Sequence, residues 1–268
     1  MTQEVSSPEE QAKRVWSLGS YSDIAPHFLS MAAHLVDATD VSSNDAVLDV
    51  GCGTGNVAIT AARRGASATG LDIAPVMLDE AQENAAIAGV EDIFWREGTA
   101  TDLPFDDDAF DITLSCVGHM FADPPDAAAR ELLRVTQSGG QIAFTSWTPT
   151  SVVPAMGKTM TEYFPPKPDA PDPPFLWGDP DVVGKRLGDD VDELVFETGT
   201  VLTPVLSPAH YWEAAVTQSG MFIVALENID EDDRPALREE MIGTIEQYFD
   251  DSQNAVPMEY CLTTAVVG

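Results

Sequence analysis

The chain has 268 residues, of which 44% are apolar, so it is long enough to bury a full core as one large domain. Asp and Glu number 45 against 13 Lys and Arg, which gives a formal net charge of −32. Because no basic stripe is present to neutralise phosphates, this balance argues against a nucleic-acid partner. The acids are interleaved with apolar runs, and we expect an acidic surface suited to a halophilic, high-salt cytoplasm.

The three cysteines, Cys52, Cys116 and Cys261, lie far apart in apolar stretches. This pattern favours reduced core thiols, and no metal-ligand spacing is present. The first ten residues are polar and acidic, unlike a signal peptide, and no apolar run reaches membrane-spanning length. We therefore expect a soluble, cytoplasmic monomer or homodimer with no metal and no membrane partner.

The N-terminal segment, residues 1–40, is predicted to form a helical cap. Residues 1–10 are expected to be frayed, and a short helix follows over 10–18. Apolar residues at helical spacing predict a second helix that begins at residue 22 or 23 and runs to about 37.

The next segment, residues 41–147, alternates between strand and helix patterns. Strands are expected at 47–50, 68–73, 93–97, 110–116 and 140–146, and helices at 57–64, 76–88 and 124–135. Short connections between alternating elements are typical of an α/β fold with a doubly wound, mostly parallel sheet. Such sheets bind ligands at the carboxyl ends of their strands.

The remaining segment, residues 148–268, is predicted to complete the same domain. Seven prolines between 165 and 180 predict an irregular stretch. Helices are expected at 179–187, 208–226 and 234–249, and strands at 192–203 and 259–267. We expect the two late strands to join the sheet as an antiparallel addition, giving seven strands, and the helices to form a lid over the strand ends.

A glycine-rich turn separates the first expected strand from its helix, with glycines at 51, 53 and 55. Glycine lets the backbone bend sharply or approach a ligand, and the following helix start offers unpaired N–H groups. The spacing is G-x-G-x-G, which differs from the G-x-G-x-x-G of dinucleotide-binding proteins, and no Gly-Lys-Ser/Thr follows as in a P-loop. A structural turn without a ligand is the remaining alternative.

The run Asp49-Val50-Gly51-Cys52-Gly53-Thr54-Gly55 resembles motif I of the class I S-adenosylmethionine-dependent methyltransferases. The resemblance continues in order through Gly70-Leu71-Asp72, the loop at 98–105, Phe110-Asp111 and the segment 134–140. It covers about residues 45–147. The pattern, with its Leu-Pro-Phe loop, is similar to the small-molecule branch of the family (methyltransferase type 11, UbiE-like).

This resemblance implies a methyl transfer from S-adenosylmethionine to a small-molecule acceptor, with S-adenosylhomocysteine as product. It implies that the cofactor is bound by Asp49, Gly51, Cys52, Gly53, Gly55, Asp72, Ile73, Thr99, Ala100, Ser115 and Tyr21. Asp72 would accept hydrogen bonds from both ribose hydroxyls, since a carboxylate offers two oxygens. Asp49 would orient the turn or the methionine ammonium, and Ile73 would pack on adenine.

The adenine contact departs from the family pattern. The family usually has an acid after the glycine of the third loop, where this chain has Thr99. The Thr99 hydroxyl or the nearby Asp102 would take over that contact, and the backbone N–H of Ala100 would reach the ring. Ser115 and Cys116 are expected beside the sulfonium.

Methyl transfer is an in-line displacement that depends mainly on alignment, so a base is needed only if the acceptor must lose a proton. His119, just beyond the fourth strand, is the best-placed candidate base, and a packed or positioning histidine is its alternative. The aromatic residues Trp147, Trp177, Tyr211 and Phe222 are candidates for the acceptor pocket, against a role as ordinary lid core. Other classes stay open: a non-catalytic S-adenosylmethionine-binding protein, a nicotinamide oxidoreductase, or a methyltransferase acting on a macromolecule.

Overall fold

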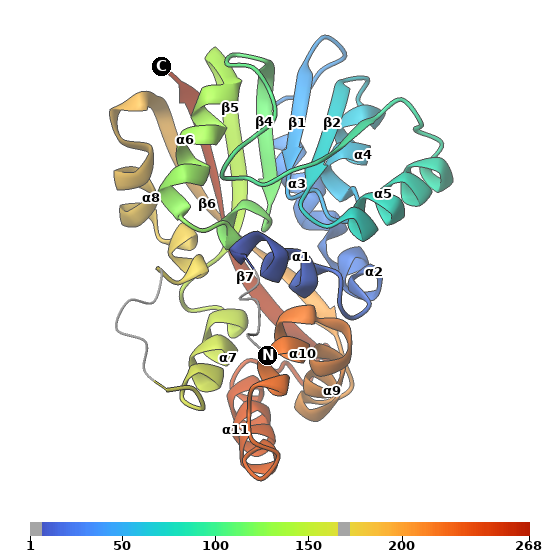
Figure 1. Ribbon diagram of the computed structural model, residues 1–268, viewed down its shortest axis with the longest axis vertical. Coiled ribbons are helices and arrows are strands. Elements are labelled where there is room, and N and C mark those ends of the chain that lie inside the picture. Colours follow the sequence, from blue (N-terminus) through green and yellow to red (C-terminus); the bar gives the residue numbers. More distant parts are fainter. Residues whose placement is uncertain (1–6, 166–171) are drawn as a thin grey trace, which may run out of the picture.

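The computed structural model describes residues 7–165 and 172–268, which form a seven-stranded sheet with helices on both faces (Figure 1). The strand order is β3-β2-β1-β4-β5-β7-β6. The strands are β1 (Ala46–Val50), β2 (Ser67–Asp72), β3 (Phe94–Glu97), β4 (Phe110–Cys116), β5 (Thr136–Trp147), β6 (Val191–Pro204) and β7 (Ala255–Val267).

The predicted α/β class with an antiparallel C-terminal strand is confirmed. β1 to β5 pair in parallel, and β7 is antiparallel to both β5 and β6. One detail of the prediction is wrong: β6 runs in the direction of the core strands, because its antiparallel partner β7 is itself reversed. Only the segment of β7 from residue 260 onward pairs with β5, so its beginning and the end of β6 extend past β5 as a two-stranded ribbon.

The helices fall into three groups. Their bounds are α1 (Pro8–Trp16), α2 (Tyr21–Ile24), η1 (Ala25–Phe28), α3 (Leu29–Asp37), α4 (Asn56–Arg63), α5 (Pro75–Ala88), η2 (His119–Phe121), α6 (Pro125–Val135), α7 (Val152–Thr161), η3 (Pro174–Gly178), α8 (Pro180–Leu187), η4 (Gly188–Asp190), α9 (Pro208–Gln218), α10 (Gly220–Glu227) and α11 (Arg234–Glu246). α3, α4 and α5 cover one face of the sheet, and α6 and α8 cover the other. α7, α9, α10 and α11 pack together beyond the carboxyl ends of the parallel strands, in the lower half of Figure 1.

The central strands are apolar because helices cover both of their faces. Val47, Leu48 and Val50 of β1 are fully buried, as is Leu114 of the neighbouring β4. α3 belongs to the same core, since its Met31 and Leu35 are buried against the sheet. The centre of the sheet is therefore a rigid support for the loops that leave its carboxyl edge.

The N-terminal segment differs from its prediction in two ways. Within the stretch expected to be frayed, Ser7 and Glu10 form a reciprocal capping box at the start of α1, and residues 1–6 lie outside the described residues. The helix expected from residue 22 to about 37 is divided into α2, η1 and α3 around Pro26. The Ala25 carbonyl accepts a hydrogen bond from the Asn56 side chain. The Leu29 N–H donates to the Pro26 carbonyl, three residues earlier, as in a 3₁₀ helix.

The C-terminal half shows three further differences. α7 was not expected; its Pro154 stands in the first turn, where a missing N–H is tolerated. The single helix expected at 208–226 is two helices that meet at Ser219 and Gly220. A side chain at Gly220 would collide with the Val15 carbonyl of α1, so the chain turns there to pack closely. In the proline-rich stretch, residues 174–178 form η3, and the prolines at 166, 168 and 171 lie outside the described residues.

Candidate functional site

The glycine turn between β1 and α4 adopts a backbone that only glycine accommodates without strain. Gly51, Gly53 and Gly55 have φ angles of 67°, 50° and 89°, all in the left-handed region. The turn also packs tightly on the loop after β4: a Cβ built on Gly51 would lie 2.8 Å from the Cα of Gly118. The glycines therefore keep the backbone of two strand ends in direct contact.

Asp49 of β1 has one oxygen engaged and one free. Its Oδ2 accepts the Ala58 N–H at 3.0 Å, which fixes the start of α4. Its Oδ1 has no hydrogen-bond partner, although the residue is only 1% exposed. Burial raises the pKa of Asp49 to about 7. A buried, unpartnered carboxylate oxygen fits a cationic group such as the methionine ammonium.

Asp72, at the end of β2, ties two loops together. Its Oδ2 accepts the Gly53 N–H at 2.8 Å and its Oδ1 accepts the Ala74 N–H at 2.9 Å. The side chain is buried, and burial raises its pKa. Each carboxylate oxygen can accept a second bond, so this geometry leaves room for the predicted pair of ribose contacts. Ile73 follows at the same edge, half-buried.

A small cavity of about 30 Å³ lies against the turn. Its lining residues are Tyr21, Phe28, Asp49, Gly51, Cys52, Gly53, Thr54, Asn56, Val57 and Cys116. This volume corresponds to about one water molecule, so a cofactor-sized ligand requires the covering residues to move. Tyr21 is one of them: a Cβ at Gly53 would lie 3.5 Å from its ring, and burial raises its pKa.

The cavity brings together five of the residues predicted to bind the cofactor, namely Tyr21, Asp49, Gly51, Cys52 and Gly53. It does not include Ser115, whose hydroxyl donates to the Val50 carbonyl at 2.6 Å and accepts the His119 N–H. Cys116 lines the cavity in its place, and burial raises the pKa of its thiol to about 12. Sequence reasoning missed Phe28, because η1 brings it from a segment with no motif of its own. It also missed Thr54, Asn56 and Val57, which lie within the glycine turn and at the start of α4 and could have been found from their position in the motif.

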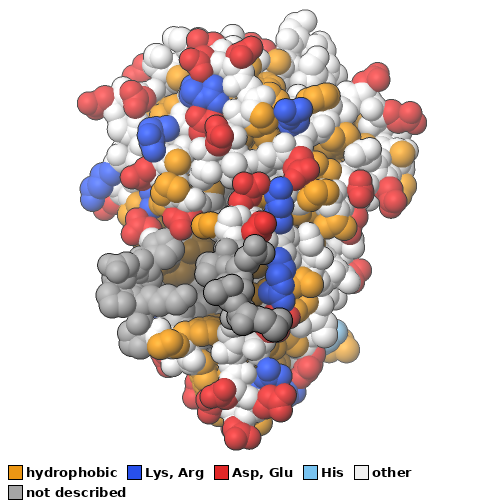
Figure 2. All heavy atoms as spheres, viewed as in Figure 1, with side chains coloured by type: hydrophobic (Ala, Val, Ile, Leu, Met, Phe, Trp, Pro, Cys, Tyr) orange, Lys and Arg blue, Asp and Glu red, His pale blue; other side chains and the backbone are white. Residues whose placement is uncertain are grey.

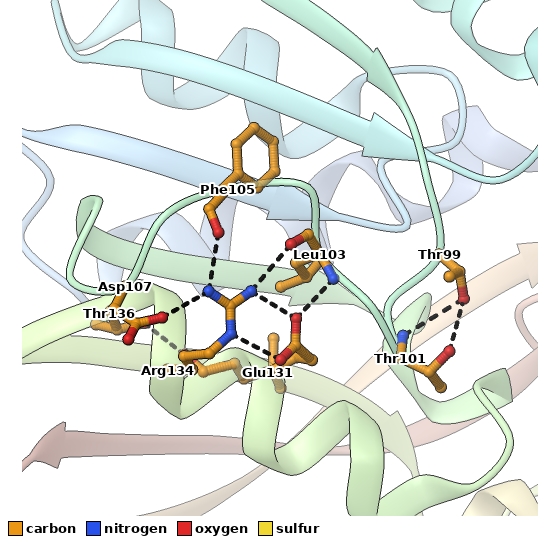
Figure 3. Close-up of polar contacts among 9 residues, drawn as sticks. Thr99, Thr101, Leu103, Phe105, Asp107, Glu131, Arg134 and Thr136 are labelled. Carbon is orange, nitrogen blue, oxygen red and sulfur yellow. Dashed lines mark hydrogen bonds and ion pairs between the residues drawn. The ribbon is translucent and has the colours of Figure 1, made fainter.

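The loop after β3 is closed by its own hydrogen bonds (Figure 3). The Thr99 hydroxyl lies 3.0 Å from the Thr101 hydroxyl and accepts the Thr101 N–H, so it is already engaged. Asp102 is exposed, and Ala100 is half-buried. Of the two side chains predicted to hold adenine, Asp102 is therefore the one whose oxygens the loop leaves available.

Arg134 of α6 clamps this loop, a role that the sequence did not reveal. Its guanidinium donates to the Leu103 carbonyl at 2.9 Å and the Phe105 carbonyl at 2.8 Å, and pairs with Glu131 and Asp107 (Figure 3). Glu131 in turn accepts the Leu103 N–H at 2.6 Å. The pairing with Glu131 raises the pKa of Arg134. The loop is therefore held to α6 both by the Arg134 donors and by the Glu131 acceptor.

His119, the candidate base, is fully buried outside the cavity. Its ring centroid lies 4.4 Å from that of Phe144 and 4.6 Å from that of Trp177. Neither ring nitrogen has a hydrogen-bond partner, and burial lowers its pKa to about 3. The imidazole is therefore neutral at pH 7 and weakly basic. This environment favours the packed or positioning role over the base, which stays a prediction.

The four aromatic candidates for the acceptor pocket are not brought together. Trp147 packs edge to face on Phe28, with centroids 5.5 Å apart. Trp177 packs on Phe144, which lies on the opposite face of β5 from Trp147 because their spacing is odd. Tyr211 and Phe222 lie half-buried in α9 and α10. Of these four residues, Trp147 contacts Phe28, which lines the cavity.

Two features are absent from residues 7–165 and 172–268. No helix there has the length and apolar character needed to cross a bilayer. No group of three or more His, Cys, Asp or Glu side chains is arranged to hold a metal ion.

Comparisons with known proteins identify the family and the fold. The family model described as "Methyltransferase domain" (Methyltransf_25) matches residues 47–140. The chain is 37% identical over 201 residues to the uncharacterised protein Rv1403c of Mycobacterium tuberculosis (strain ATCC 25618 / H37Rv), covering 75% of this chain and 73% of that protein. It is 32% identical over 145 residues to a ubiquinone biosynthesis O-methyltransferase of Paracidovorax citrulli (strain AAC00-1), covering 53% and 60%. A geranyl diphosphate methyltransferase solved in complex with S-adenosylmethionine shares the fold, with a TM-score of 0.52 at 17% identity and coverage of 90% and 85%.

Proposed function

Because the chain belongs to the class I S-adenosylmethionine-dependent methyltransferases, we propose that it transfers a methyl group from that cofactor to a small-molecule acceptor in the cytoplasm. The observation that carries the proposal is the free Asp49 Oδ1 in a cavity walled by the glycine turn. It offers one negative charge beside exposed backbone, as a cationic amino acid moiety requires.

In this proposal the residues at the carboxyl ends of the parallel strands each bind a part of the cofactor. Asp49 holds the ammonium, Asp72 holds the ribose hydroxyls, and Ile73 packs on the adenine. Asp102 and the Ala100 N–H reach the adenine edge, from a loop that Arg134 keeps in place. Tyr21 closes over the methionine part. When bound, the cofactor supplies a methyl group already activated on a sulfonium, so the protein's main task is alignment.

Two observations support a small-molecule acceptor. The net charge of −32 disfavours RNA and DNA, whose phosphates it repels. The matched O-methyltransferase of Paracidovorax citrulli carries ubiquinone biosynthesis in its name, which is small-molecule chemistry.

The test is to incubate the protein at high salt with methyl-labelled S-adenosylmethionine and with separate small-molecule, RNA and protein fractions of a cell extract. Label transferred to a small molecule supports the proposal. Label on RNA or protein fractions alone contradicts the acceptor class. Cofactor binding measured by calorimetry in the same preparation shows whether the protein is folded.

A second candidate is a non-catalytic S-adenosylmethionine-binding protein. The burial of His119 away from the cavity favours it, since no other candidate base was identified at the turn. Tight cofactor binding without turnover in any extract fraction would support this second candidate. A nicotinamide oxidoreductase is disfavoured by the G-x-G-x-G spacing, and an absence of absorbance change with NAD(P)H would exclude it.

A further inference from the structure

A group of buried polar atoms without partners gathers on the α6 and α8 side of the sheet. They are both ring nitrogens of His119, Nε1 of Trp177, Oγ of Ser146 and Nη1 of Arg186. Leaving a buried donor or acceptor unpaired is unfavourable, so folded proteins contain few such atoms. Elsewhere among the described residues, Asp49 Oδ1 lies where a ligand is proposed to bind, and Glu80 Oε2 and Ser151 Oγ are also without partners.

These side chains lie close together. His119 and Trp177 are 4.6 Å apart by ring centroids, and the guanidinium carbon of Arg186 is 4.8 Å from the Trp177 ring. Ser146 lies two residues beyond Phe144 on β5, hence on the same face, and Phe144 contacts both aromatic neighbours. His119 and Ser146 are fully buried, and the Arg186 side chain is only 6% exposed.

The group also adjoins the glycine turn. Ser115 links the Val50 carbonyl to the His119 N–H, and a Cβ built on Gly51 would lie 3.6 Å from the same nitrogen. A molecule whose polar end lies against His119 therefore has its body near the position that we assign to the methionine part of the cofactor.

The unpartnered atoms are mostly donors. Trp177 and Arg186 can only donate, a neutral imidazole donates from one nitrogen, and Ser146 can donate as well. Arg186 also carries a positive charge. Asp172 and Asp126 pair with its Nη2 and Nε, at 3.0 and 3.6 Å, and leave Nη1 free on the buried side. Donors with a buried cation are complementary to an anionic oxygen and unfavourable for a cation.

We propose that His119, Ser146, Trp177 and Arg186 form a subsite for an anionic oxygen group, such as a carboxylate, on the methyl acceptor. The inference rests on the proposed function and makes its acceptor an organic acid. His119 is then a neutral hydrogen-bonding residue of the subsite. Because the side chains are closed to solvent, occupancy requires Trp177 to shift, and its element η3 has only five residues and no side-chain cap.

The direct test uses benzoate as a probe, with benzamide as its uncharged match, titrated by calorimetry into the full chain saturated with S-adenosylhomocysteine at constant KCl. We expect benzoate to bind and benzamide not to bind. Arg186→Gln should weaken benzoate binding by about tenfold to a hundredfold, as expected for a lost charged hydrogen bond. Arg238→Gln, which removes an exposed arginine paired with Glu213, is the matched control and should change nothing.

Two milder variants keep the test decisive if Arg186→Gln does not fold. Trp177→Phe removes the ring N–H donor together with part of the ring, and Ser146→Ala removes a single hydroxyl. Each should weaken benzoate binding while the affinity for S-adenosylhomocysteine stays unchanged. Equal binding of benzoate and benzamide, or benzoate binding unaffected in every variant that folds, overturns the subsite.

A second measurement separates this inference from the proposed function. The extract used in the labelling experiment is divided on an anion exchanger at neutral pH. Acceptor activity in the retained fraction supports an acidic acceptor. Activity only in the unretained fraction overturns the subsite and leaves methyl transfer intact. Absence of activity in both fractions contradicts the proposed function, while the benzoate titration still tests the subsite on its own.

Discussion

The Asp72 carboxylate accepts the Gly53 N–H at 2.8 Å, so the residue proposed to hold the ribose also holds the glycine turn. One side chain thus joins the ends of β1 and β2. Its substitution tests ligand binding and local order together, and the choice of variant separates the two.

Asp72→Ala should abolish cofactor binding in calorimetry, because both oxygens are removed. Asp72→Asn keeps one acceptor oxygen and should retain part of the turn while weakening binding at least tenfold, since the amide donates where a ribose hydroxyl needs an acceptor. Unchanged cofactor affinity in either variant would contradict the ribose assignment. Thermal unfolding of both proteins reports how much of the loss is structural.

Asp49 predicts a pH dependence of cofactor affinity. Its pKa of about 7 is above the unfolded value, so the free protein holds a proton there below pH 7. A bound ammonium favours the ionised carboxylate, so binding releases that proton, and affinity should fall up to about tenfold per pH unit between pH 7 and 5. Asp49→Asn should bind more weakly at pH 7 and show a flat profile. A wild-type profile that is equally flat would contradict the ammonium contact.

The raised pKa of Asp49 affects the stability of the cofactor-free protein in the opposite direction: stability falls as pH rises, whereas cofactor affinity rises. A folded state that binds more protons than the unfolded chain loses stability as pH rises between the two pKa values, here from about 4 to about 7. We expect the cofactor-free protein to lose this contribution over that window, and Asp49→Asn to remove it. Urea unfolding at pH 5 and pH 7, compared between the two proteins, measures the difference.

Close packing at Gly118 should not tolerate a side chain. A Cβ there would lie 2.6 Å from the Gly51 carbonyl oxygen and 2.9 Å from that of Val50, and backbone cannot move aside cheaply. Gly118→Ala should destabilise the fold by about 1–3 kcal/mol. Gly243→Ala, in open space within α11, is the matched control and should stabilise by about 0.5–1 kcal/mol. Equal effects in urea unfolding would contradict the close approach of the two strand ends.

Removal of Arg134 should loosen the adenine loop. Arg134→Gln loses the ion pairs with Glu131 and Asp107 and the full set of guanidinium donors, at a cost of about 1–3 kcal/mol. Hydrogen exchange at the Leu103 amide, which donates to Glu131, should become faster, and cofactor affinity should fall. Arg238→Gln should cost less than about 1 kcal/mol, as exposed pairs do. Slow exchange at Leu103 in the Arg134 variant would show that the clamp is dispensable.

The acidic surface predicts a dependence on salt. Figure 2 shows Asp and Glu side chains scattered over the visible face rather than gathered in one patch. A net charge of −32 repels itself, and the repulsion is screened within about 3 Å at 1 M salt against about 10 Å at 0.1 M. The Tm should therefore rise with KCl concentration. A Tm unaffected by molar KCl would argue against this adaptation.

Sequence patterns predicted those elements that are determined by residues close together in the chain. The alternation of strand and helix from β1 to β5, the glycine turn and Asp72 follow from periodicity and turn chemistry within short windows. The break between α9 and α10 does not, because it depends on the Val15 carbonyl meeting Gly220 from the other end of the chain. The seclusion of His119 likewise depends on Trp177, which only the folded chain brings onto it.

Helix α1 has no buried residue, yet it spans the two halves of the molecule. Lys13 pairs with Glu97 of β3 and Arg14 pairs with Glu227 of α10. Such exposed pairs contribute less than about 1 kcal/mol each, and salt weakens them further. Part of the attachment of the segment that carries Tyr21 is thus sensitive to salt, whereas the close packing of the Val15 carbonyl on Gly220 and of the Trp16 ring on Phe121 is not. At molar KCl, cofactor exchange should therefore be faster than in dilute buffer, even though screening of the net charge stabilises the fold.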